Sequence, residues 1–183
     1  MNNNHIIIGY GNWAKKIINF LKINNFFKRI IVVTRKRQFF IFPTYKKIDK
    51  KDLNSHYLKA QSVHICSSNQ SHFFYIKKFA NLNKSMIVEK PFLNHEKDFK
   101  NINKIYKKNK KKIFVNYTDL YNFYFPKIKK IIHINKNGKI KLNIYYAGSD
   151  KKFKKKTECV SEWLDHPLSI ILEIFKSFPK FKI

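Results

Sequence analysis

The chain has 183 residues, of which 44% are hydrophobic, enough for one cored domain or for one domain and part of a second. No apolar run is long enough to span a bilayer, and the N-terminus lacks the pattern of a signal peptide. The two cysteines, Cys66 and Cys159, lie far apart and suggest neither a disulfide framework nor a metal cage. We therefore expect a cytoplasmic protein with no membrane partner and no metal.

The net charge of +28 would, taken alone, predict a nucleic acid or an anionic surface as partner. However, the lysines are spread along the chain and accompany many Asn, Ile, Phe and Tyr residues, which AT-rich codons encode. Lysine runs such as 107–112 and 151–156 are typical of solvated loops or faces. We expect nonspecific binding of RNA at low salt and no specific nucleic-acid partner.

The first predicted elements are a strand at 5–8, a tight turn and a helix at 12–23. The turn, Gly9-Tyr10-Gly11-Asn12-Trp13-Ala14, has the glycine spacing of the dinucleotide-binding fingerprint. Gly9 would let the chain turn off the strand, Gly11 would let the backbone approach a pyrophosphate, and Ala14 would let the helix pack closely. Residues 12–14 would then present N–H groups to the phosphates. An ordinary strand–helix turn is the alternative.

Strands and helices alternate through the rest of the first part of the chain. Further strands are predicted at 29–33, 39–42, 62–66, 85–88 and 113–117, and further helices at 52–60, 71–82 and 94–108, the last capped by Asn94. This order indicates an α/β fold, a Rossmann-like doubly wound parallel sheet, that closes near residue 118. Residues 1–118 are thus predicted to form a dinucleotide-binding domain.

The pattern changes in residues 119–183. We predict a helix at 121–134 with a break at Pro126, a strand with one solvated face at 139–146, and an amphipathic helix at 160–176. These elements predict a partial α+β domain for a substrate or for oligomerisation.

The end of the second strand bears on the choice of cofactor. An acidic residue there would bind the ribose 2′-OH of NAD, but the chain has Thr34-Arg35-Lys36-Arg37. With Thr34 and Arg35 placed to meet a 2′-phosphate, we expect NADP as the cofactor, with NAD as the alternative. The opposing interpretation is that basic residues occur everywhere in this chain.

Two later motifs carry a family resemblance. Residues 63–72, Val-His-Ile-Cys-Ser-Ser-Asn-Gln-Ser-His, precede Glu89-Lys90-Pro91, which follows a strand. Together with the glycine turn, these motifs resemble the Gfo/Idh/MocA oxidoreductases, well over residues 5–135 and more weakly to about residue 176. The resemblance implies that a nicotinamide cofactor is bound by Ser67, Ser68, Asn69, His72, Glu89, Lys90 and Pro91.

The resemblance also implies catalytic residues. Lys90 would lie beside the nicotinamide and the substrate. The corresponding Lys–Pro bond is often cis in this family, so we expect a cis bond between Lys90 and Pro91. The family has an acid four residues before a histidine on a helix, which Glu162 and His166 match. His166 would act as general acid/base and Glu162 would orient it. The alternatives are that Lys90 is one of many surface lysines, and that a helix begins here with Asp165 as cap and Pro167 in its first turn.

The function implied is an NAD(P)-dependent oxidoreductase that transfers hydride to or from an alcohol or ketone of a sugar, cyclitol or sugar nucleotide. The C-terminal domain of the family is a large open sheet, so this chain would hold a truncated one, and a homodimer would be weakened. Two alternatives stay open. One is a non-catalytic NAD(P)-binding remnant or partner subunit, and the other is a basic nucleic-acid-binding protein. The residues do not identify the substrate.

Overall fold

The computed structural model describes residues 4–24, 29–34, 39–42, 44–107, 112–135, 143–145 and 164–175. They belong to two compact units, Met1–Asn116 and Tyr117–Ile183. The first unit contains β1 (Asn4–Ile8), α1 (Asn12–Ile23), β2 (Arg29–Val33), β3 (Phe39–Phe42), β4 (Lys46–Lys47), α2 (Lys50–Lys59), β5 (Ala60–Ile65), α3 (Asn69–Asn81), β6 (Met86–Val88), α4 (Glu96–Lys107) and β7 (Ile113–Val115). The second contains the short 3₁₀ helix η1 (Thr118–Tyr121), α5 (Phe125–Ile134) and α7 (Asp165–Phe175).

The sheet of the first unit has the strand order β4-β3-β2-β1-β5-β6-β7. The strands β1, β2, β5, β6 and β7 run parallel, and Ile7 of β1 lies opposite Val32 of β2 and His64 of β5. The chain leaves β1 toward β2 and later returns to β5 on the other side of β1. The crevice at the carboxyl ends of β1 and β5 is therefore the switch point where doubly wound folds bind ligands.

The predicted doubly wound fold is confirmed, but the sheet is mixed rather than wholly parallel. Strand β3 pairs antiparallel with β2, and β4 pairs antiparallel with β3. Only residues 34–38 separate β2 from β3, which is too short for the crossover that a parallel pair requires. Strand β4 was not predicted, since two adjacent lysines carry no strand pattern.

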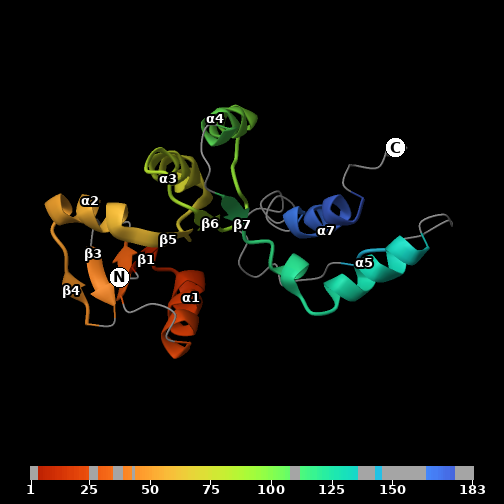
Figure 1. Ribbon diagram of the computed structural model, residues 1–183, viewed down its shortest axis with the longest axis horizontal. Helices are drawn as coiled ribbons and strands as arrows, with labels where there is room; N and C mark the ends of the chain where they lie inside the picture. The colour runs from red at the N-terminus through yellow and green to blue at the C-terminus, as the bar shows by residue number, and fades with distance from the viewer. Residues whose placement is uncertain are drawn as a thin grey trace, which may run out of the picture. The chain divides into compact units, whose positions relative to one another are not determined.

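The two faces of the sheet are covered by different helices. Ile6 and Ile8 of β1 pack into a core with residues of α2, α3 and α4, whereas Ile7 packs with Ala14 and Ile18 of α1. Figure 1 shows α1 on one side of this sheet and α2 and α3 on the other. Burial of both faces explains why β1 and β2 are nearly continuous apolar runs.

Several predicted boundaries move in the structure. Helix α3 begins at Asn69, so the polar loop before it is shorter than predicted. The predicted Asn94 cap is wrong, because α4 begins at Glu96 and the His95 carbonyl accepts from the N–H groups of Asp98 and Phe99. Pro126 does not break a helix but lies in the first turn of α5, where its missing N–H costs nothing.

The regular elements in the described part of the second unit are all helices. The Lys129 ammonium of α5 lies 2.6 Å from the Glu173 carboxylate of α7, and the Ser169 hydroxyl donates to the His166 carbonyl. Of the predicted strand at 139–146, the structure describes only residues 143–145, and these are not in a strand. Within the described ranges, no helix combines the length and the apolar character needed to cross a membrane.

Candidate functional site

Backbone hydrogen bonds hold the residues that follow each parallel strand in one row. The N–H groups of Gly9, Cys66, Glu89 and Asn116 donate to the last or nearly last carbonyl of the neighbouring strand at 2.7–2.9 Å: Val33, Ile8, Ile65 and Val88 respectively. Chemically active side chains that follow different strands are thereby brought to one edge of the sheet. This edge is where an α/β sheet of this topology binds its ligands.

Gly9 is required by the backbone. Its φ of +103° is a conformation that side chains rarely adopt, and a Cβ at this position would lie 2.7 Å from the Cys66 carbonyl oxygen. The turn after β1 therefore touches the end of β5. The predicted sharp turn at Gly9 is present, and its cause is the close approach of the two strand ends.

Gly11 has a different role. Its backbone is extended, it precedes the first residue of α1, and a Cβ there would meet no atom within 4 Å. No side chain caps α1, and its first turn holds no acidic residue. The N–H groups of residues 12–14 therefore meet no competing anion in this turn, which suits a pyrophosphate. Ala14 is fully buried against β1, and Trp13 is exposed.

A cavity of about 1260 Å³ opens beside this turn. Five of the residues predicted to bind a cofactor line it: Gly9, Gly11, Thr34, Ser67 and Ser68. Asn12, Trp13, Ala14, Asn69, His72, Glu89, Lys90 and Pro91 do not. The volume is ample, because small-molecule pockets typically measure about 300–1,000 Å³. The arrangement of glycine turn, uncapped helix and cavity fits a dinucleotide.

The cavity also contains lysines that sequence reasoning missed. Lys50 and Lys51 come from the first turn of α2, and Lys78 from α3, where its Nζ lies 4.3 Å from the centre of the Tyr57 ring. Burial lowers the pKa of Lys78 below its usual value. The described lining residues include no carboxylate. These lysines lie about 15 and 45 residues after Thr34 in the sequence, and no local pattern indicated that they line the same cavity as Thr34.

Thr34 follows β2 at the same cavity. Its hydroxyl oxygen is buried and finds no hydrogen-bond partner within the described residues. A buried hydroxyl without a partner is costly, so a ligand that bonds to it is stabilised. Arg35, which was predicted to act with Thr34, lies outside the described residues.

His72 joins the two predicted cofactor loops. It is almost completely buried, with Nε2 3.0 Å from the Ser67 carbonyl oxygen and Nδ1 3.0 Å from the Pro91 carbonyl oxygen. His72 thus positions the loops, and the Lys90–Pro91 bond within the second loop is cis.

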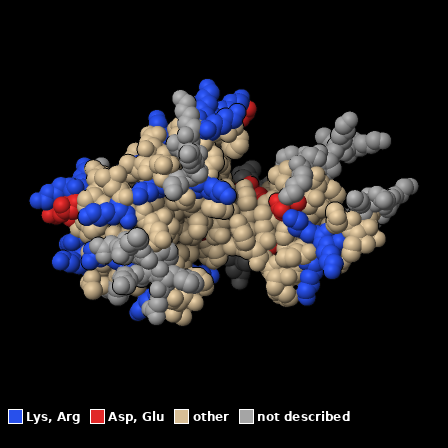
Figure 2. Space-filling model, in the orientation of Figure 1, with Lys and Arg blue, Asp and Glu red and all other residues tan. Residues whose placement is uncertain are grey.

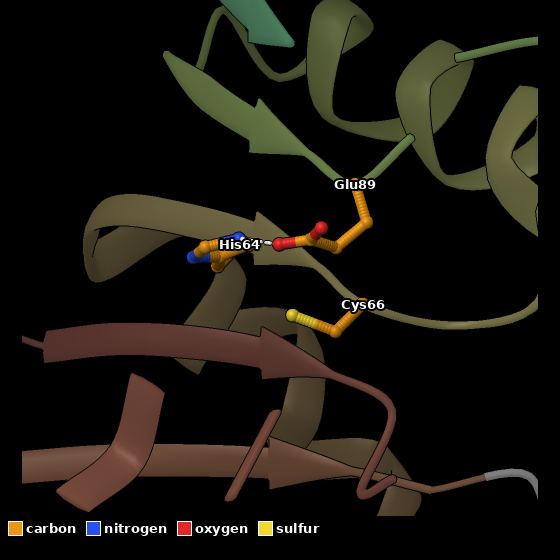
Figure 3. A group of neighbouring side chains, drawn as sticks. All are labelled: His64, Cys66 and Glu89. Atoms are coloured by element: carbon orange, nitrogen blue, oxygen red, sulfur yellow. Dashed lines mark hydrogen bonds and ion pairs between the residues drawn. The ribbon is translucent and has the colours of Figure 1, made fainter. Parts of the chain in front are cut away.

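Next to this loop, His64, Cys66 and Glu89 form a cluster in which His64 and Glu89 are buried and Cys66 is partly buried (Figure 3). His64 Nε2 lies 3.0 Å from Glu89 Oε1, which also accepts a hydrogen bond of 2.8 Å from the Asn116 amide. Burial, and then the charge of Glu89, raise the pKa of the Cys66 thiol. Of these residues only Glu89 was predicted to be functional, because the cluster depends on which strands are neighbours.

In the second unit, His166 lies in the first turn of α7, with Nδ1 3.1 Å from Oδ2 of Asp119. Glu162, predicted to orient His166, lies outside the described residues. Pro167 falls in the first turn of α7, as the alternative interpretation expected, but Asp165 is the first residue of this helix and not the cap that precedes it. Asp119 was missed, although an acid soon after the last strand of the sheet was an available signal. Lys90 and His166 belong to different units, so their joint action stays a prediction.

Lysine and arginine side chains do not gather into one patch on the face shown in Figure 2. Figure 2 shows several separate groups of them on the visible face, with fewer acidic side chains between. This distribution contrasts with the single basic stripe or patch that is typical of nucleic-acid-binding proteins.

The family model described as "Oxidoreductase family, NAD-binding Rossmann fold", that of Gfo/Idh/MocA proteins, matches residues 4–117. No curated protein sequence matches the chain.

Solved structures share the fold at low identity. They include an inositol dehydrogenase homolog from Azotobacter vinelandii in complex with NADH and myo-inositol (13% identity, TM-score 0.75, 97% of this chain and 54% of that chain). Others are an oxidoreductase from Sinorhizobium meliloti (13%, 0.59, 75% and 43%) and apo scyllo-inositol dehydrogenase from Lactobacillus casei (12%, 0.52, 75% and 43%). The chain spans about half the length of these proteins.

Proposed function

The chain belongs to the Gfo/Idh/MocA oxidoreductase family, and from this premise we propose that it is a nicotinamide-dependent oxidoreductase that acts on a polyhydroxylated alcohol or ketone. The observation that carries the proposal is the glycine turn after β1, which opens on a cavity of about 1260 Å³ at the switch point of the sheet. The substrate class follows the inositol dehydrogenases among the structural neighbours, whose substrates are cyclitols.

Different residues of the first unit would bind different parts of the cofactor. The backbone of residues 11–14 would hold the pyrophosphate, because α1 presents its N-terminal N–H groups there without a side-chain cap. The Thr34 hydroxyl would bond to the adenosine ribose. Ser67 and Ser68 line the same cavity at the start of α3, where their hydroxyls would meet the nicotinamide half.

We propose NADP rather than NAD as the preferred cofactor. Lys50, Lys51 and Lys78 line the cavity, no described lining residue is acidic, and a 2′-phosphate adds two negative charges. NAD is the alternative, because the similar inositol dehydrogenase homolog from Azotobacter vinelandii is in complex with NADH. The test is a fluorescence titration of the purified chain with NADPH and NADH. Tighter binding of NADPH is expected, and binding of neither would contradict the proposal.

When bound, the nicotinamide supplies the site that gives or accepts hydride. The chain would supply the groups that handle charge on the substrate oxygen. Lys90 would stabilise negative charge on that oxygen, and His166 would take or give the hydroxyl proton. Asp119 would act as a positioning residue, because its carboxylate lies beside Nδ1 of His166 and would orient the imidazole ring. Glu162 would add to this orientation.

A second candidate is a protein that binds the cofactor without turnover. It is favoured by one observation, namely that the family model matches residues 4–117, which hold the nucleotide-binding fold, and not the residues around His166. The two candidates differ in a single measurement. Binding of NADPH together with NADP⁺ reduction in the presence of myo-inositol or another polyol supports the enzyme, whereas binding without any turnover supports the second candidate.

A further inference from the structure

We propose that His64, Cys66 and Glu89 form a binding site for one divalent transition metal ion of the zinc class. Each residue offers one ligand atom, and these atoms lie within 4.8 Å of one another. His64 and Glu89 are buried, while Cys66 is partly exposed, so that an ion has a path to the cluster. The proposal does not depend on the cofactor or on the reaction proposed above.

The sheet itself places the three side chains together. Residues 64 and 66 are two apart along the direction of β5 and therefore project from the same face. Glu89 follows the adjacent parallel strand β6, and its N–H donates to the Ile65 carbonyl at 2.9 Å. Figure 3 shows the imidazole, the thiol and the carboxylate gathered on this face. The positions are thus set by sheet register and not by a flexible loop.

The ligand set points to zinc rather than to calcium or magnesium. Thiolate and imidazole are ligands of softer ions, and one cysteine, one histidine and one carboxylate resemble the three-ligand sites that keep a fourth position open. Ligand atoms on a tetrahedral zinc ion are about 3.3–3.6 Å apart, given bonds of about 2.0–2.3 Å. Nε2 of His64 and Oε1 of Glu89, now 3.0 Å apart, would separate slightly on binding the ion, and the Cys66 sulfur would move toward them.

Neighbouring groups would support these ligands. The Asn116 amide donates to Glu89 Oε1 at 2.8 Å, as residues behind metal ligands commonly do. The His5 ring packs edge-on against His64, with ring centres 6.4 Å apart. A hydrogen-bonded pair of His64 and Glu89 would satisfy those two residues by themselves. Such a pair has no need of a thiol beside it. The presence of Cys66 next to the pair therefore favours a metal site over a purely structural contact.

Binding has a defined proton balance. The ion forms a bond to the Cys66 sulfur, and the thiol proton passes to solvent, so one proton is released at this ligand for each ion bound. The resulting thiolate–metal bond has an optical signature when cobalt replaces zinc. That signature separates this cluster from the other histidines and carboxylates of the chain.

The experiment uses the untagged, full-length chain after treatment with a chelator. Titration with Co²⁺ should saturate at one equivalent with a thiolate-to-cobalt charge-transfer band in the near ultraviolet, and Zn²⁺ should abolish this band by displacement. Cys66→Ser should lose the band and weaken Zn²⁺ binding by about 100-fold or more. Asn116→Ala should weaken binding by about 10- to 100-fold.

Two controls keep the result decisive. Cys159→Ser removes the other cysteine and should retain the band and the affinity for Zn²⁺. Glu89→Gln keeps the shape of the side chain and should retain the native circular dichroism spectrum but bind Zn²⁺ at least 10-fold more weakly. The proposal is wrong if the wild type shows no charge-transfer band at millimolar Co²⁺, or if folded Cys66→Ser binds Zn²⁺ as tightly as the wild type.

Discussion

The carbonyl oxygen of Cys66 occupies the space that a side chain at position 9 would need, since a Cβ on Gly9 would lie 2.7 Å from it. The turn after β1 is therefore locked against the end of β5. Two residues further on, a Cβ on Gly11 would meet no atom within 4 Å. The two glycines of one motif should therefore have separable roles, the first in folding and the second in cofactor binding.

This separation gives a matched pair of variants. Gly9→Ala should lower the free energy of unfolding by about 2–4 kcal/mol, because it adds a backbone clash to an unfavourable positive φ. Gly11→Val should keep most of the stability, losing about 1 kcal/mol or less at the helix N-terminus, but abolish NADPH binding by blocking the pyrophosphate. Urea unfolding and fluorescence titration measure the two effects. NADPH binding by Gly11→Val at wild-type affinity would refute the dinucleotide site.

The preference for NADPH should depend on the cations of the cavity. One charge-assisted contact to a phosphate contributes roughly 1.5–3 kcal/mol, so Lys50→Ala, Lys51→Ala or Lys78→Ala should each weaken NADPH binding up to about 10- to 100-fold. NADH binding should change far less. Arg35→Asp should narrow or reverse the preference. Lys97→Ala, which alters an exposed position of α4, serves as the control. Equal affinity of the wild type for both cofactors would count against the assignment.

Local patterns were enough to predict most of the first unit. The predicted bounds of α1, β2 and β3 match the structure, because apolar periodicity and a glycine turn act within a few residues. The direction of β3 was not specified by such patterns. It follows from the short link after β2, which forces an antiparallel return.

Only those site residues could be predicted whose role follows from their immediate neighbours in the sequence. Gly9, Gly11 and Thr34 are marked by their position after a strand, and all three line the cavity. The meeting of Lys78 with this cavity, and of Glu89 with His64, depends on packing between elements 25 or more residues apart in the sequence. Spacing along the chain carries no information about such pairs until the strand order is known.

Stability should fall in acid through His5. Burial, and then the charge of the nearby His64, lower the pKa of His5 from 6.5 to about 3. The folded state thus holds His5 neutral, and the unfolded state gains a proton below about pH 6.5. The contribution of His5 to the free energy of unfolding is fully present above pH 6.5. It is lost as the pH falls toward 3, and the loss is about 2 kcal/mol at pH 5.

The measurement is urea unfolding at pH 7.5 and pH 5 with a chelator present, so that metal release does not contribute. His5→Gln keeps a polar side chain that does not titrate, and its stability should depend less steeply on pH than that of the wild type. An identical pH dependence in the two proteins would show that His5 does not carry the effect.

The positive charge should cause nonspecific binding only. Lysines are dispersed over the visible face, so an association with RNA or DNA should be electrostatic and indifferent to sequence (Figure 2). Counterion release then predicts that affinity falls by roughly 10-fold or more between 50 and 200 mM salt. Fluorescence anisotropy with unrelated labelled oligonucleotides measures this. A complex that persists at physiological salt and prefers one sequence would favour the nucleic-acid-binding alternative.

Catalysis should require Lys90 and His166 together, with Asp119 acting through His166. Lys90→Ala and His166→Ala should each lower the turnover of NADP⁺ with myo-inositol, or with the polyol found to be active, by about 10²–10⁴-fold. The affinity for NADPH should stay nearly unchanged, because neither side chain lines the cavity.

Asp119 allows a sharper test of the arrangement around His166. Its carboxylate lies 3.1 Å from Nδ1 of His166, so Asp119→Asn should lower kcat while leaving the KM for NADP⁺ unchanged. Asp119→Glu keeps the carboxylate and should recover part of the loss, which a merely structural role would not explain, since the longer side chain fits the same space less well. Glu162→Gln tests the other predicted partner of His166. If it lowers kcat and Asp119→Asn does not, the acid that orients His166 is Glu162. If His166→Ala retains wild-type turnover, the general acid/base assignment is wrong and the non-catalytic candidate becomes the better explanation of the family match.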